Sequence, residues 1–404
     1  MKYVLVSTFP REGTQNIGDK LIELSTADAV RSFDPDAEIV TVWRAEAWDA
    51  VRESLEGADH IVFACLAIRK DMGSIYPFLT RILDMTVPIS VLAAGTNLSV
   101  GKHDMFNRGF KTADLDLLKR IGGAAEVFTT RGVLSQAFCS QHGLSRARFG
   151  GDVAFLDARF DERTFECTDK IKRIVISDPH HGDVYRPAFR ALVSSLRTRF
   201  PEAQVECALH GVNGPIEAAC SELGVTCHSI YRDPENGLDL YDNYDLHVGF
   251  RVHGHVSALK RRLPSYLLEQ DGRGTDYGLT IGRKISLPCY RRNSPEKGHD
   301  ASFGRPKRGR SLVEQFSHRF TRNKPMARNN KRFVASTASV ELLSALIQQD
   351  ATDGFSRFRG LELELDSFRK RTEAAVEEIV SNSGARRTSS LYQSRLQSRS
   401  IGTR

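Results

Sequence analysis

The sequence predicts an α/β protein with two domains, each built on a parallel sheet, followed by a basic C-terminal extension. Its 404 residues are more than one compact core usually holds. Short apolar runs alternate with longer amphipathic segments, which is typical of strands and helices in parallel sheets. The alternation starts again after a polar, charged stretch at residues 162–172, so we place the domain boundary there.

The first domain is predicted to span residues 1–165. Its first apolar run directly follows Met1 and forms a strand, and a helix begins near Gly18. Helical spacing recurs in residues 71–84, and a β-branched run at 87–94 indicates a buried strand. The expected strands are 2–7, 38–42, 59–65, 87–94 and 126–130, and the further helices are 71–84, 112–121 and 132–142.

The second domain is predicted to span residues 166–292. Its apolar runs are again short, and the segment 186–200 has a clear amphipathic pattern. The expected strands are 172–177, 204–209, 225–229, 246–250 and 265–268, with helices at 186–200 and 215–223. Two Rossmann-like domains that face each other across a cleft resemble the GT-B architecture, whose active site lies in that cleft.

The composition changes after this second domain. Residues 293–332 are rich in arginine, lysine, serine and asparagine, so we expect a basic, irregular insertion. Helical spacing returns within residues 333–381, at 340–347 and 355–379. Residues 382–404 carry several arginines and no acid, which predicts a disordered basic tail.

Bulk composition excludes several classes of protein. Hydrophobic residues make up 40% of the chain and no apolar run approaches the roughly 18 residues that span a bilayer, so we expect a cytoplasmic protein. The net charge of +7 is uneven, with dense lysine and arginine at 290–332. Aromatic residues are not interleaved with these basic residues, which argues against specific nucleic-acid binding. Peripheral contact of the basic C-terminal region with the inner face of the membrane is left open.

The cysteines give no sign of a metal site. There are seven, an odd number, and no two form a Cys-x-x-Cys pair. Both facts argue against a zinc site and against a disulfide framework. Most of them lie in apolar surroundings, where a buried and inert thiol is expected.

The segment at residues 244–255 is the most informative about function. An apolar run there ends in Arg251, His253 and His255 and passes into a helical segment. Ligands of open α/β sheets bind where strands end, and the N-terminus of a helix favours an anion. Arg251 is a forked cation suited to carboxylate or phosphate, and His253 can exchange a proton near neutral pH. If the extended conformation persists, Arg251 and His253 share a face, which predicts an anion site with a proton donor.

Two segments of the first domain supply candidate cleft residues. Gly18 allows close backbone approach, and Asn16 and Asp19 either contact a ligand or cap the following helix. Arg131 ends another predicted strand. It is either a surface arginine or a second anion clamp that would share a doubly anionic ligand with Arg251.

Three more segments supply candidates with competing structural roles. Asp152 follows two glycines and is expected mainly to hold a turn. His180 or His181 could contact a ligand, but neighbouring histidines without helical ligand spacing do not indicate a metal. Glu269 and Asp271 end the strand after the Arg251 segment and are candidate acid–base groups.

Together these segments resemble the polysaccharide pyruvyl transferase family across roughly residues 1–285. The motif Gly249-Phe250-Arg251-Val252-His253 is the most specific part of the resemblance. The other matching residues are Asn16-Ile17-Gly18-Asp19, Thr130-Arg131, Gly151-Asp152, the run from Asp245 that leads into this motif and ends at His253, and Leu263-Pro264.

The resemblance implies transfer of a pyruvyl group from phosphoenolpyruvate to two hydroxyls of a sugar, which forms a cyclic ketal. Arg131, Arg251 and His253 would bind phosphoenolpyruvate, the co-substrate, and no other cofactor is implied. His253 or Asp19 could donate the proton, and Glu269 or Asp271 could act as base. The first domain would face the acceptor, an exopolysaccharide or its lipid-linked precursor, with the cleft formed by Asn16, Gly18, Asp152, His180 and Asp271.

One segment departs from the family's pattern. Family members usually carry a glycine cluster after the strand matched by residues 60–63, whereas this chain has Ala64-Cys65-Leu66-Ala67. Side chains there narrow the cleft, so a different acceptor or a loss of activity could follow. Two alternatives therefore stand beside pyruvyl transfer: a GT-B-type glycosyltransferase that uses a nucleotide sugar, and a non-catalytic member of the fold.

Overall fold

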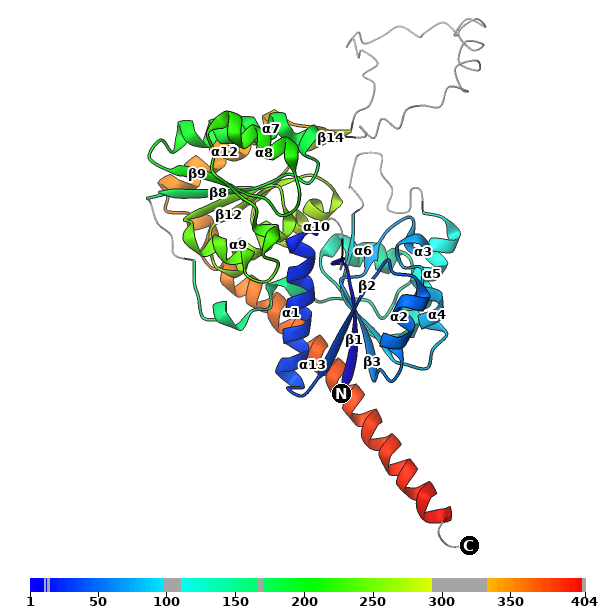
Figure 1. Ribbon diagram of the computed structural model, residues 1–404. Helices are drawn as coiled ribbons and strands as arrows, with labels where there is room; N and C mark the ends of the chain where they lie inside the picture. Colours follow the sequence, from blue (N-terminus) through cyan, green and yellow to red (C-terminus); the bar gives the residue numbers. More distant parts are fainter. Residues whose placement is uncertain (11, 13–14, 98–109, 166–169, 293–332, 402–404) are drawn as a thin grey trace, which may run out of the picture.

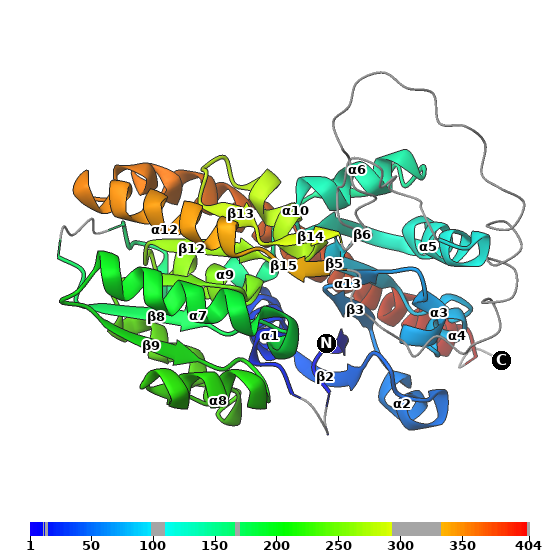
Figure 2. The same cartoon turned by 90° about the horizontal axis from the view of Figure 1, so that it is seen from above.

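The computed structural model describes residues 1–10, 12, 15–97, 110–165, 170–292 and 333–401. Two parallel sheets lie side by side, with helices on both faces of each (Figure 1, Figure 2). This confirms the predicted pair of Rossmann-like domains in a GT-B-like arrangement. The predicted insertion at residues 293–332 lies outside the described residues.

The first sheet has seven parallel strands in the order β2-β1-β3-β5-β6-β7, with β4 beside β5. Every residue of β3 and β5 is buried, as expected for strands covered on both faces. The strands are β1 (Lys2–Ser7), β2 (Glu38–Trp43), β3 (His60–Ala64), β4 (Ala67–Ile68), β5 (Ile89–Thr96), β6 (Ala125–Thr130) and β7 (Arg148–Phe149). The helices are α1 (Ile17–Phe33), α2 (Trp48–Leu55), α3 (Met72–Ile75), α4 (Leu79–Leu83), α5 (Thr112–Ala124) and α6 (Val133–Gln141).

The single helix predicted at residues 71–84 is wrong, because the chain forms the two short helices α3 and α4 there. Pro77 lies between them. A residue that precedes proline is disfavoured in the α-helical region, and Tyr76 has φ −123° and ψ 73°. The apolar spacing was correct, but the proline divides the helix.

The second sheet has six parallel strands in the order β10-β9-β8-β11-β12-β13. The strands are β8 (Arg173–Ser177), β9 (Gln204–Ala208), β10 (Cys227–His228), β11 (Leu246–Gly249), β12 (Ser265–Glu269) and β13 (Ser286–Pro288). The helices are α7 (Gly182–Arg199), α8 (Gly214–Leu223), α9 (Val252–Lys260) and α10 (Gly272–Thr280). A separate antiparallel pair joins β14 (Tyr290–Arg292) to β15 (Phe333–Ala335).

In each sheet the first strand in the chain has later strands on both sides, so the strand order reverses at this first strand. β1 lies between β2 and β3, and β8 lies between β9 and β11. Ligands of open α/β sheets bind outside the carboxyl ends of the strands at such reversal points. The topology therefore directs attention to the loops that follow β1, β3, β8 and β11.

The two C-terminal helices pack on different domains. α12 (Thr337–Thr352) lies on α7 and β12 of the second domain. α13 (Leu361–Ile401) then returns to the first domain, where it contacts α1, β5 and β6 (Figure 2). The end of the chain thus helps to hold the two domains together.

α13 extends into the segment 382–404, which the composition predicted to be a disordered tail. The helix continues through Ile401, although the composition predicted disorder from residue 382. Alanine, arginine, leucine and glutamine are good helix formers, and no proline interrupts this segment. Low hydrophobicity therefore did not prevent helix formation.

Every helix in the described ranges is too short or too polar to cross a bilayer.

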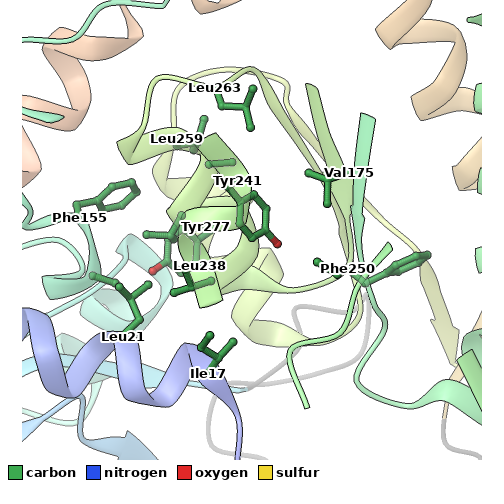
Figure 3. Close-up of a cluster of buried hydrophobic side chains, with 14 of the residues drawn as sticks. Ile17, Leu21, Phe155, Val175, Leu238, Tyr241, Phe250, Leu259, Leu263 and Tyr277 are labelled. Carbon is green, nitrogen blue, oxygen red and sulfur yellow. The ribbon is translucent and has the colours of Figure 1, made fainter. Parts of the chain in front are cut away.

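One hydrophobic core runs through both domains. Ile17 and Leu21 of α1 lie against Leu238 and Leu259 of the second domain (Figure 3). All four side chains are buried, and burying a side chain of this size stabilises a fold by about 1.5–3 kcal/mol. α1 is therefore a rigid bridge that presents its N-terminus to the second domain.

Candidate active site

A small cavity lies between the domains, beside the reversal points of both sheets. Its volume is about 30 Å³, which is room for about two water molecules. The side chains around it come from loops and helix starts on both domains. They are Asn16, Arg131, His180, His210, Phe250, Arg251, Val252, His253, Gln270, Asp271 and Arg273.

Arg251 is held in place by a buried carboxylate. Its Nε and Nη2 donate to the two oxygens of Asp178 at 2.9 and 2.7 Å. Asp178 is fully buried and follows β8, whereas Arg251 follows β11, the neighbouring strand. A forked pair of this kind fixes the plane of the guanidinium. The third nitrogen, Nη1, contacts His180 Nδ1 at 3.0 Å.

His253 stands in the first turn of α9, beside the first domain. The extended conformation ends at Arg251, the N-cap of α9, so Arg251 and His253 do not share a strand face as predicted. Both nevertheless line the cavity. The N-terminus of α1 lies in close contact with His253. A Cβ atom added to Gly18 would lie only 2.5 Å from His253 Nδ1. Close approach of the domains therefore requires glycine at position 18.

Arg131 enters the cavity from the end of β6 in the first domain. It is buried and its Nη2 donates to the carbonyl of Thr96 at 3.1 Å. Among the described residues it forms no ion pair with a carboxylate within 4.0 Å. Asp152 and Asp276 interact with it at longer range. Arg131 is thus a buried cation without a direct counter-ion, and such cations are normally paired.

Three nitrogen atoms in this cavity are buried without a hydrogen-bond partner in the described part of the chain. They are Arg131 Nε, His210 Nδ1 and His253 Nε2. Most buried polar groups find a partner, and each exception calls for an explanation. An arginine N–H and two imidazole nitrogens that can each carry a proton, from three separate segments around one cavity, are suited to a ligand rich in oxygen atoms.

The histidines of the cavity resist protonation. Burial is the main reason that the pKa of His253 is lowered, and Arg131 and Arg273 add to the effect while Asp152 and Asp19 oppose it. Burial and Arg251 lower the pKa of His180 to about 4. These rings are therefore neutral at pH 7 in the free protein, and additional negative charge would favour their protonation.

The two predicted carboxylates at the end of β12 lie in different places. Asp271 lines the cavity, and Arg273 binds both of its oxygens. Arg273 thereby helps to hold the pKa of Asp271 at about 2 despite burial. Glu269 points elsewhere, since its oxygens accept from Thr275 and Ser286. The structure therefore does not bring Glu269 together with the other candidates.

The remaining predicted residues support the site from its edge. Asn16 lines the cavity and caps α1 by accepting from the Gly18 backbone N–H at 3.2 Å. Asp19 accepts from Asn16 and Thr8, each at 3.2 Å. Asp152 caps a short turn and accepts from Tyr277. His255 is buried behind the cavity on Ser265.

Cys65, in the segment where the family usually has glycines, adopts a conformation that favours glycine. Its φ is +64°, in the left-handed region that costs other residues about 1–2 kcal/mol. Its sulfur lies 3.9 Å from Arg131 Nη1. Burial raises the pKa of this thiol to about 11, so it stays neutral and does not compensate the arginine.

This strain leads to a prediction about Cys65. In the middle of a helix or strand, a protein with glycine is usually about 0.5–1 kcal/mol less stable than the same protein with alanine. Because Cys65 is in the left-handed region, we expect Cys65→Gly to be more stable than Cys65→Ala by about 1 kcal/mol. Urea unfolding of both variants measures this difference. A less stable glycine variant would show that the backbone at this position is unstrained.

Four residues of the site were missed by sequence analysis: Asp178, His210, Gln270 and Arg273. Each follows a strand of the second domain, β8, β9 or β12, by one to four positions, which is the signal that could have found them. Asp178 lies in a segment that attracted notice for its histidines. Gln270 lies between Glu269 and Asp271, and its amide oxygen accepts from the His180 backbone N–H at 2.8 Å.

A larger cavity of about 500 Å³ lies elsewhere, beside α1. All of its lysine and arginine side chains are paired with aspartates that also line it. Asp157 binds Lys260 at 3.0 Å and Arg159 at 2.9 Å, and Asp239 binds Arg261 at 2.7 Å. These groups already satisfy each other, so this cavity is a weaker candidate for an anionic ligand.

Comparison with known proteins identifies the family. The profile described as "Polysaccharide pyruvyl transferase" matches residues 16–271, which is more than half of the chain. No curated protein sequence gives a significant match. The cavity residues from Asn16 to Asp271 all fall within the matched range.

Similar solved structures have low sequence identity. The UDP-GlcNAc 2-epimerase from Neisseria meningitidis is 9% identical with a TM-score of 0.43, covering 87% of this chain and 100% of that one. The UDP-GlcNAc 2-epimerase from Methanocaldococcus jannaschii is 9% identical with a TM-score of 0.43, covering 86% and 100%. The wall teichoic acid polymerase TagF is 10% identical with a TM-score of 0.42, covering 95% and 89%. From the profile match, the chain belongs to the polysaccharide pyruvyl transferase family.

Proposed function

We propose that this protein transfers a pyruvyl group from phosphoenolpyruvate to two hydroxyls of a sugar in an exopolysaccharide or its precursor. The observation that carries the proposal is the convergence of the unpaired nitrogens of Arg131, His210 and His253 on one cavity. Phosphoenolpyruvate carries a carboxylate and a phosphate. Its oxygens can accept from these nitrogens, and its negative charge would lie beside the cation of Arg131, which Asp152 and Asp276 reach only at longer range.

The proposed reaction begins with protonation of the donor. A proton from His253 adds to C3 of phosphoenolpyruvate and leaves cationic character at C2. One sugar hydroxyl attacks C2 and loses its proton. Arg131 and Arg251 stabilise the phosphate as the C2–O bond breaks. The second hydroxyl then adds to C2, closes the ring and gives its proton to the departing phosphate. The products are the cyclic ketal and inorganic phosphate.

Asp271 is the carboxylate best suited to accept the hydroxyl proton in this scheme. It lines the cavity, whereas Glu269 is turned toward Ser286 and Thr275. A low pKa does not prevent this role, because the proton leaves a hydroxyl that is adding to a cationic carbon. Asp19 stands behind Asn16 and would act on the ligand mainly through its charge.

The lowered pKa of His253 predicts how binding depends on pH. The ring is neutral in the free protein, and a bound anion raises its pKa. The complex then binds more protons than the free protein, so affinity for phosphoenolpyruvate should increase as pH falls from 8 to 6.5, by at most about tenfold per unit. Calorimetric titration across this range measures the slope.

The matched control for this pH dependence is His253→Gln. The phosphate of the ligand itself titrates near pH 6, but it contributes equally to both proteins. The wild type should therefore show the steeper slope. Equal slopes in the two proteins would remove His253 from the proton balance.

The proposed function is tested by thermal unfolding of the full chain with phosphoenolpyruvate or with UDP-N-acetylglucosamine. A ligand at 100 times its Kd stabilises the native state by about 2.7 kcal/mol. Phosphoenolpyruvate should stabilise the wild type and the surface control Arg120→Ala, but not Arg251→Ala or His253→Ala. A response to the nucleotide sugar alone would replace pyruvyl transfer with glycosyl transfer, and no response to either would favour a non-catalytic protein.

A further inference from the structure

Three cysteines that are separated in the sequence come together at one edge of the second sheet. They are Cys207 in β9, Cys220 in α8 and Cys227 in β10. Their sulfur atoms all lie within 4.8 Å of one another. The cluster is outside the cavity described above and has no part in the proposed transfer.

Local geometry explains why the three thiols meet. Cys207 and Cys227 are direct neighbours in the register of β9 and β10, so their side chains share a face of the sheet. α8 ends at Gly224, which has φ +58°. The Val225 N–H then donates to the Cys220 carbonyl at 2.9 Å. This tight turn brings β10 back beneath the last turn of α8.

The spacing of the sulfur atoms suits a single metal ion. A metal–sulfur bond is about 2.3 Å long for zinc, so three sulfurs around one ion lie about 3.8–4.0 Å apart. The observed limit of 4.8 Å requires little movement to reach that spacing. Within the described ranges no histidine or carboxylate joins the cluster, which leaves three soft sulfur ligands.

The cluster also has a route to solvent. Cys207 and Cys220 are buried, whereas Cys227 is partly exposed on β10, the outermost strand of the sheet. Cys227 lines an open depression together with His228 and Arg232. An ion could enter there, and nearby positive charge would help to offset the charge of three thiolates.

We infer that Cys207, Cys220 and Cys227 bind one thiophilic metal ion with a filled d shell, such as Zn²⁺, Cd²⁺ or Cu⁺, through three thiolates. Soft sulfur ligands select ions of this class. Binding releases the thiol protons and joins β9, α8 and β10 at one point. His210 and Asn213 lie within this segment, so the ion would also stabilise the part of the chain that reaches the cavity.

The test uses the reduced full chain and Cd²⁺ as the probe. Each cadmium–thiolate bond absorbs in the ultraviolet, so titration reports the number of ions and the sulfur ligands. In the wild type we expect the absorbance to rise up to one equivalent of Cd²⁺ and then to level off, which gives a break in the titration curve. Cys139→Ser, which removes a buried thiol of the first domain, should show the same break. The break should be lost in Cys227→Ser and in Cys220→Ser.

Thermal unfolding supplies an independent readout. One equivalent of Cd²⁺ or Zn²⁺ should raise the Tm of the wild type and leave that of Cys227→Ser unchanged. Cys227 is partly exposed, so this variant is expected to fold. The inference is overturned if no break occurs at one equivalent, or if Cys227→Ser titrates like the wild type. It is also overturned if Cys139→Ser loses the signal to the same extent.

Discussion

Arg131→Gln is expected to weaken phosphoenolpyruvate binding by about 10- to 150-fold. A hydrogen bond that involves a charged group contributes about 1.5–3 kcal/mol, which corresponds to that loss. Arg131 forms no ion pair within 4.0 Å among the described residues, so its charge can interact directly with a ligand. Glutamine keeps a hydrogen-bond donor but removes the charge. Calorimetric titration with phosphoenolpyruvate measures the change.

The stability of this variant separates binding from folding. Because Arg131 forms no direct ion pair with the described residues, removing its charge should change the free energy of unfolding by less than about 1.5 kcal/mol. Arg120→Gln is the matched control, since Arg120 is half exposed and pairs with Asp84 on the surface. Wild-type affinity in Arg131→Gln would mean that the donor anion does not bind there.

Asp178→Asn is expected to destabilise the protein by about 3–5 kcal/mol, because it leaves Arg251 charged and buried without its partner. Asp178 accepts from Arg251 and also from the His210 N–H and the Asn213 amide. The amide of an asparagine would place a donor against one of these donors. Urea unfolding measures the loss, and the ligand response should fall as well.

The matched control for this change is Asp84→Asn, which breaks an exposed ion pair of similar length. Arg120 and Asp84 lie 3.0 Å apart, and pairs of this kind contribute about 0–1 kcal/mol. A double-mutant cycle with Arg251→Met isolates the buried pair. A coupling below about 0.5 kcal/mol would contradict the account of Asp178 as the residue that positions Arg251.

Much of the fold could be predicted because the spacing of apolar residues, and the alternation of short and long apolar segments, depend only on nearby residues. The runs at β1, β8 and β12 are short, apolar and followed by helices, and they form strands as expected. The failures have local causes that the spacing does not reveal. Pro77, for example, divides the helix predicted at residues 71–84 into α3 and α4.

The candidate site was less predictable, because its contacts join distant segments. Arg251 and Asp178 are 73 positions apart in the chain, and no periodicity relates them. Glu269 and Asp271 are two positions apart, yet only Asp271 lines the cavity, because the chain leaves the strand between them. Motif spacing identified which loops matter, but not which side chain in each loop faces the ligand.

The most direct test of the central claim is a crystal structure of the protein with phosphoenolpyruvate at ten times its measured Kd. We predict that the ligand lies between the domains, with its oxygens accepting from Arg131 Nε and His253 Nε2. Phosphoenolpyruvate bound away from Arg131, Arg251 and His253, or a cavity without the ligand at that concentration, would contradict the account.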